Sequence, residues 1–94
     1  MIKISEKAKR VIPETLKNHP SKMLRIIISG FGWGGPRIGL VLDEPNKEET
    51  HTFDKVKILI ESKIENYLGS LIIDVVKNFR NEDELIVKSN YGAC

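Results

Sequence analysis

The chain has 94 residues, a formal net charge of +2 and 40% hydrophobic residues, which indicates one globular domain with a single modest core. Its 15 basic residues are interspersed with 13 acidic ones and aromatic residues make up only 6%, so neither a basic surface for nucleic acid nor a row of base-stacking platforms is expected. No apolar run approaches the roughly 18 residues of a membrane span, and the polar N-terminus does not resemble a signal peptide.

The N-terminal part predicts a short strand followed by a helix. Residues 2–4 alternate as a strand does, and Ser5 is a suitable N-cap for a helix that ends near His19. Pro13 lies inside this helical pattern and removes an amide donor, so we expect it to kink the helix or to split it into two pieces. The apolar stripe of the helix consists of Ala8, Val11, Ile12, Thr15 and Leu16.

Two strands follow, over residues 23–29 and 38–43, and a long glycine-rich loop is expected to join them. Residues 43–50 read as a polar turn. Further strands are predicted at residues 52–53 and 56–61, where apolar residues alternate with polar ones.

A short second helix is predicted from a capping box at Ser62–Glu65. We expect Ile64, Tyr67 and Leu68 to face inward and Gly69 to cap the C-terminus of this helix. Strands over 71–76 and 85–88 then complete the domain, and residues 89–94 read as a loose tail. Because helices do not alternate regularly with strands, the fold class is α+β with mainly antiparallel pairing, in one domain over residues 1–94.

The segment Ser29–Leu40 contains five glycines and the only tryptophan, Trp33. Residues 30–35 match the pattern G-x-G-x-x-G, but a dinucleotide-binding loop must open a helix, and this one leads into a strand. A hairpin connection with glycines at positive φ is the plainer interpretation. It explains the glycines but not a tryptophan among them.

The segment Leu24–Glu44, LRIIISGFGWGGPRIGLVLDE, resembles the central motif of the HesB/IscA-like family of A-type iron–sulfur proteins. That family has a strand, a glycine-rich turn that holds a cysteine, and a strand reading roughly G-L-x-L-D-E. Residues 56–74 resemble the second block of the family. The resemblance covers most of the chain and implies a compact HesB-like domain with an N-terminal helix and a short second helix.

The chain departs from the family pattern at the cysteines. Trp33 falls at the position of the loop cysteine, and Cys94 stands alone where the family has a C-G-C pair. The chain looks closest to HesB-like proteins that carry selenocysteine in this loop; selenocysteine is encoded by UGA, one base from the tryptophan codon UGG. Soft thiolate ligands hold iron–sulfur clusters, so we expect cluster or iron binding to be impaired in the chain as written.

Several single residues allow a functional and a structural interpretation. Cys94 is either a metal ligand or redox thiol, or a tail cysteine without a role. Arg37 could bind an anion together with the amides of the loop glycines, or be an ordinary solvated residue. His51 is interpreted as a polar residue at a strand edge rather than a metal ligand, and Asp74 as an outward-pointing carboxylate. The loop glycines proposed for the anion site are Gly32, Gly34 and Gly35.

The resemblance implies a scaffold or carrier in iron–sulfur cluster assembly or transfer rather than a turnover enzyme. It implies a homodimer and iron–sulfur recipient proteins as partners, without nucleic acid or membrane. The single cysteine excludes an internal disulfide, and a reducing cytoplasm is the expected compartment. Two alternatives stay open: a cluster-free domain that binds proteins, and a thiol or selenol redox protein centred on position 33.

Overall fold

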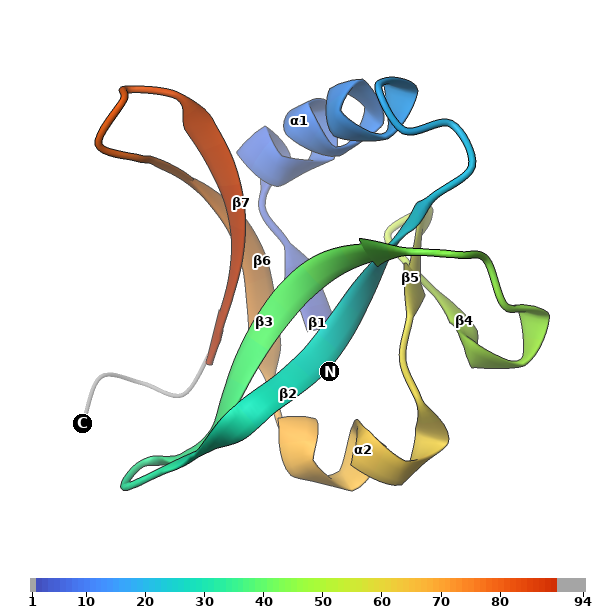
Figure 1. Cartoon of the computed structure of the whole chain (residues 1–94), viewed down its shortest axis with the longest axis vertical. Coiled ribbons are helices and arrows are strands. Elements are labelled where there is room, and N and C mark those ends of the chain that lie inside the picture. The colour runs from blue at the N-terminus through green and yellow to red at the C-terminus, as the bar shows by residue number, and fades with distance from the viewer. Residues whose placement is uncertain (1, 90–94) are drawn as a thin grey trace.

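The computed structural model describes residues 2–89 and has two helices and seven strands in that range (Figure 1). The predicted α+β class is confirmed. In chain order the elements are β1 (Ile2–Ile4), α1 (Glu6–Lys17), β2 (Met23–Gly32), β3 (Gly35–Asp43), the 3-10 helix η1 (Lys47–Glu49), β4 (Thr50–Phe53), β5 (Val56–Leu59), α2 (Ser62–Leu68), β6 (Leu71–Lys77) and β7 (Asp83–Ser89).

The strands form two sheets, with the orders β1-β6-β7 and β3-β2-β5-β4. Within the described part, β1 pairs with β6 and β2 with β5 in parallel, whereas the pairs β2–β3, β4–β5 and β6–β7 are antiparallel. The mixed, mainly antiparallel pairing expected from the sequence is therefore confirmed. Each parallel pair joins strands that are distant in the sequence, because parallel neighbours need a long crossover connection.

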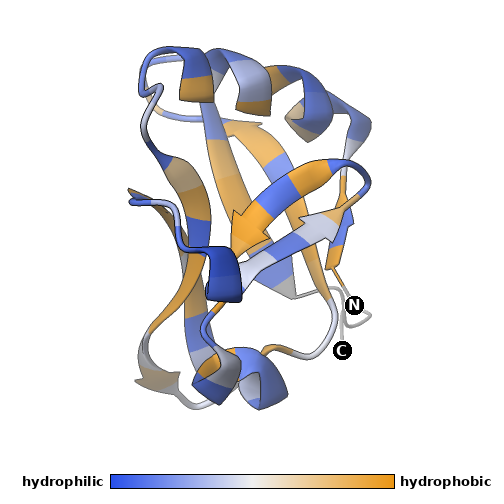
Figure 2. Ribbon diagram, turned by 90° about the vertical axis from the view of Figure 1, so that its right-hand side faces the viewer, coloured by the Kyte–Doolittle hydropathy of each residue, from blue (hydrophilic) through white to orange (hydrophobic). Residues whose placement is uncertain are grey.

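The core is made of aliphatic side chains from both sheets and from both helices. On β6, Leu71, Ile73 and Val75 alternate with less buried residues and point into it, which is the period-two pattern of a strand with one covered face. Figure 2 shows the apolar segments along the strands, whereas α1 carries hydrophilic residues along much of its length. The helices α1 and α2 lie at opposite ends of the molecule in both views (Figures 1 and 2).

Helix α1 begins as predicted and continues past its proline. The Ser5 hydroxyl accepts a hydrogen bond from the Ala8 amide at 3.1 Å, which satisfies one free donor of the first turn. The expected split at Pro13 is wrong, because one helix runs over the whole span. Pro13 is exposed, while Ala8 and Ile12 are buried, so packing of the inner face outweighs the local cost of the missing amide. A kink at Pro13 stays a prediction.

The glycine-rich segment is not the long loop predicted from the sequence. Strands β2 and β3 extend through it until Gly32 pairs with Gly35, which leaves only Trp33 and Gly34 in the turn. The register shifts between Ile28 and Gly30, and Gly35 has a φ of 111°, a conformation that favours glycine. The glycines therefore continue a two-stranded ribbon to its tip and do not form a loose connection.

The start and the inner face of α2 also differ from prediction. The N-cap is Glu61, without a side-chain capping bond, and Ser62 is already helical, so the predicted capping box is not formed. Leu68 is buried as expected, but Tyr67 is 58% exposed because it lies on the outer side of this short helix. Gly69 has a φ of 59° and follows the last helical residue, which confirms its predicted C-cap role.

The predicted boundaries of the remaining elements move by a few residues. The polar segment 43–50 contains η1, which begins after Asn46, and the Asn46 side chain accepts bonds from the amides of Glu48 and Glu49. Strand β7 begins at Asp83 and includes Ser89, the first residue of the predicted tail. The rest of that tail, with Cys94, lies outside the described residues.

Candidate functional site

The tip of the β2–β3 hairpin presents the tryptophan that the sequence singled out. Trp33 is fully exposed and Phe31, two residues earlier on β2, is 69% exposed. The Phe31 ring meets the ring of Tyr67 on α2 edge to face, with centroids 6.2 Å apart and planes at 79°. The hairpin tip extends at the end of the molecule that carries α2 (Figure 1). Exposed aromatic groups from two elements thus lie at one end of the domain.

Arg37 lies beside the glycines with which the sequence grouped it. It pairs in register with Gly30, and a Cβ atom placed on Gly32 would lie 3.4 Å from Arg37 Nε, so the guanidinium lies over that glycine. A Cβ atom on Gly34 would meet no neighbouring atom. Arg37 has no ion pair with a carboxylate of residues 2–89. An anion site formed by Arg37 and these glycines stays a prediction.

The described residues do not supply the ligands of a metal cluster. Residues 2–89 contain no group of three or more His, Cys, Asp or Glu side chains placed to hold a metal ion. Trp33 has no donor atom suited to iron, and Cys94 is outside the described part. The described residues therefore do not supply the ligands for an iron–sulfur cluster held by one chain.

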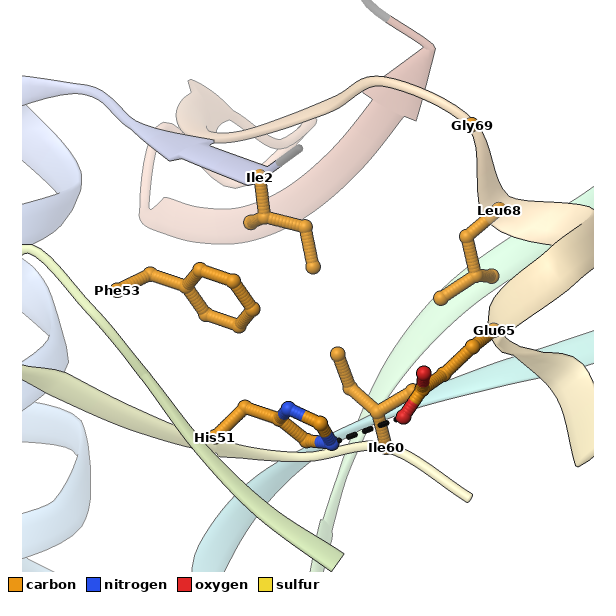
Figure 3. A pocket seen from close by; sticks show the side chains of 7 residues that line it. All are labelled: Ile2, His51, Phe53, Ile60, Glu65, Leu68 and Gly69. Atoms are coloured by element: carbon orange, nitrogen blue, oxygen red, sulfur yellow. Dashed lines mark ion pairs between the residues drawn. The ribbon is translucent and has the colours of Figure 1, made fainter. Parts of the chain in front are cut away.

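His51 lies on β4, an edge strand of its sheet, as the sequence analysis predicted. Its Nε2 is 3.0 Å from Oε1 of Glu65 on α2, within ion-pair distance when the ring is protonated, and its ring stacks on Phe53 at an interplanar angle of 14°. Figure 3 shows these side chains around a pocket of about 250 Å³. The other residues lining it are Ile2, Ile60, Leu68 and Gly69.

A charged cluster around Arg25 was not predicted from the sequence. Arg25 on β2 is only 12% exposed, and its guanidinium contacts Asp43 and Glu49 at 2.7 Å each. Lys22 contacts Glu44 at the same distance. Asp43 and Glu44 belong to the L-x-L-D-E stretch that carries the family resemblance, and here they hold the N-terminal end of β2. The cluster is structural in this geometry, since each carboxylate is bound to a basic side chain.

The electrostatics of this cluster follow from its contacts. The backbone amide of Glu44 and the Arg25 guanidinium lower the pKa of the Asp43 carboxyl below its ordinary value. The carboxylates raise the pKa of Arg25, with the hydrogen bond to Glu49 as the largest cause. Both shifts favour the charged forms of Arg25 and Asp43.

Two further sequence candidates have structural roles. The His19 amide donates to the Leu16 carbonyl at 3.0 Å just after α1, in agreement with its interpretation as a helix-end residue. The Asp74 side chain is 30% exposed and lies 3.7 Å from the Lys88 ammonium. The Ser5 side chain, the Val75 amide and Lys88 lower the pKa of Asp74, so this carboxylate of β6 is charged and contacts the N-cap of α1 and Lys88 of β7.

No protein-family model matches the chain, and no curated protein matches its sequence. Among solved structures, Escherichia coli SufA, described as involved in the biosynthesis of iron–sulfur clusters, matches with a TM-score of 0.74 and 14% identity over 99% of this chain and 85% of that one. IscA, solved with its [2Fe-2S] cluster, matches with a TM-score of 0.63 and 20% identity over 96% of this chain and 83% of that one. The chain therefore has the fold of SufA and IscA.

Proposed function

We propose that this chain is an A-type carrier of the HesB/IscA kind, a scaffold or carrier in iron–sulfur cluster assembly or transfer. Two observations support it: the sequence resembles the central motif of that family, and the fold is that of SufA and IscA. The proposed activity is the delivery of a cluster to recipient proteins in a reducing cytoplasm, with no turnover chemistry of its own, and it is impaired in the chain as written because Trp33 stands at the cysteine or selenocysteine position of the family. The cluster is cargo in this proposal.

The position of Trp33 carries the proposal. The residue at the tip of the β2–β3 hairpin is fully exposed and is not packed against the core. This position therefore suits a side chain that must contact another molecule. The family resemblance puts a cysteine or selenocysteine there. With tryptophan at that place, Cys94 is the only thiol of the chain, and one thiolate does not hold a cluster.

The test is anaerobic reconstitution with iron and sulfide of the chain as written, of Trp33→Cys, and of Trp33→Cys combined with Cys94→Ser. We expect little iron in the first protein. In Trp33→Cys, two chains would supply four thiolates to one cluster shared across a homodimer, measured by iron and sulfide content, visible absorbance and sedimentation. Loss of that cluster in the double variant is expected. An inert Trp33→Cys thiol that takes up no iron would overturn the carrier proposal.

A cluster-free protein-binding domain is the second candidate, and the aromatic hairpin tip favours it. Phe31, Trp33 and Tyr67 are exposed together, and aromatic residues are enriched in the centres of protein interfaces. The codon at position 33 in the gene separates the candidates. UGA with a selenocysteine insertion element favours the carrier or a selenol redox protein, whereas UGG favours the cluster-free domain.

A further inference from the structure

The pocket beside His51 has apolar walls that come from three elements and from the segment between β5 and α2. Ile2 of β1, Phe53 of β4, Ile60 after β5 and Leu68 of α2 surround it, and Figure 3 shows these side chains directed toward a common space. None of its lining residues belongs to β2 or β3, the strands of the glycine hairpin. Its volume is about 250 Å³. The proposed carrier function makes no use of it.

The polar side of this pocket is formed by Glu65 and His51, and only one oxygen of the carboxylate is held by the imidazole. Glu65 is 44% exposed, so a ligand can reach it, and among residues 2–89 its ion-pair contact is with His51 alone. That contact is made by Oε1, and no ion pair of Oε2 with a residue of 2–89 is present. Among residues 2–89, no lysine or arginine lines the pocket. The pocket therefore offers one carboxylate oxygen to a ligand beside apolar walls.

The His51 imidazole lies next to that carboxylate, and the Phe53 ring lines the same pocket. Phe53 lines the pocket and stacks on His51, whose Nε2 is the atom nearest to Glu65. A carboxylate together with an aromatic ring attracts an ammonium group, through charge and through the negative face of the ring. The same surroundings disfavour an anion. Charge complementarity therefore indicates that the polar group of a ligand is a cation.

The size of the pocket limits the rest of the ligand. Engineered apolar cavities of roughly 150 Å³ hold one benzene ring. The pocket here is larger, at about 250 Å³, and is open on the side of the half-exposed His51 and Glu65. There is room for one ring and a short arm that carries a head group.

We propose that this pocket binds a small primary amine with a ring-sized apolar body. The body lies among Ile2, Ile60 and Leu68, and the ammonium lies between the Glu65 carboxylate and the Phe53 ring. The proposal concerns the chain without iron and is independent of the carrier function.

Titration of the isotope-labelled chain, followed by amide resonances in NMR, tests this proposal. Benzylamine is the probe at pH 8, with benzyl alcohol and benzoate as neutral and anionic analogues of similar shape. With benzylamine we expect saturable chemical-shift changes confined to residues 51–53, 60 and 65–69. Benzyl alcohol should bind at least about fivefold more weakly, and benzoate should cause no saturable change.

Three variants separate recognition of the head group from folding. Glu65→Gln should lower the affinity for benzylamine at least about fivefold and leave the affinity for benzyl alcohol unchanged. His51→Phe should retain benzylamine binding, because it keeps the aromatic stack and leaves the carboxylate free. Glu48→Gln, an exposed carboxylate on η1 outside the pocket, is the matched control and should change nothing. Equal binding of all three probes, no saturable shift, or an unchanged affinity in Glu65→Gln would overturn the proposal.

Discussion

At the scale of single residues, exposure separates the residues that face other molecules from those that hold the fold. Trp33 is fully exposed at a two-residue turn, whereas Arg25 is 12% exposed and bound to carboxylates. Both belong to the segment that carries the family resemblance. One motif therefore contains an exposed position that can contact other molecules and an ion-paired position that supports the fold. Substitution should affect stability less at the first position than at the second.

Replacement of Trp33 by cysteine should add a thiol at the hairpin tip and leave the stability of the domain nearly unaltered. The indole makes few contacts within the chain, so the free energy of unfolding should change by about 1 kcal/mol or less. Urea unfolding followed by circular dichroism measures this, because the variant has no tryptophan fluorescence. A much earlier transition would mean that Trp33 is a packed residue.

The Asp43 carboxylate should stabilise the fold in a pH-dependent way. Its pKa in the folded chain is lowered, so its contribution is complete above the ordinary pKa of an aspartate and is lost as the pH falls through the lowered value. Asp43→Asn should therefore be less stable than the native chain at pH 7, and the difference should shrink below about pH 4. Urea unfolding at several pH values tests this, with Glu48→Gln as the control. A difference that is constant with pH would contradict the assignment.

At the scale of elements, tertiary packing decides more than local preference. Helix α1 tolerates Pro13 because its opposite face is buried, and α2 begins without the capping bond that its sequence offers. The β2–β3 ribbon likewise keeps strand pairing through a run of glycines. Isolated helix and strand signals are weak compared with the burial of a shared apolar face.

Pro13→Ala should stabilise the protein. The substitution restores an amide donor in the interior of α1 at an exposed position, for an expected gain of about 1–3 kcal/mol after allowance for the more flexible unfolded chain. Thermal and urea unfolding measure the gain. Glu14→Ala, at the next exposed position of the same helix, is the control and should change stability by about 0.5 kcal/mol or less. No gain in Pro13→Ala would mean that α1 has adapted its geometry to the proline.

At the scale of the whole molecule, two sheets with parallel crossovers enclose one aliphatic core. Strand β6 is central to this arrangement, because it pairs with β1 on one side and with β7 on the other. Within the described part, no polar or charged side chain is buried in that core. The charged clusters lie at its margins, and stability of the domain therefore depends chiefly on apolar packing.

Ile73→Ala should be strongly destabilising. Ile73 is fully buried on β6, and its truncation should cost about 2–5 kcal/mol through lost transfer energy and a residual cavity. Ile72→Ala, on the opposite face of the same strand and only half-buried, should cost clearly less. Urea unfolding of the pair gives the comparison. Equal losses would contradict the assignment of the core face.

The sequence by itself determined the fold class, the order of the helices and strands and most of the core, since alternating and helical apolar patterns report which face of each element is covered. It also singled out Trp33 among the glycines and predicted His51 as a strand-edge residue. Only the tertiary structure decided the length of the hairpin strands, the continuity of α1 and the exposure of Tyr67. The Arg25 cluster and the pocket with Glu65 also required it. Their residues lie on different elements, and nothing local in a sequence records which side chains from distant segments will meet.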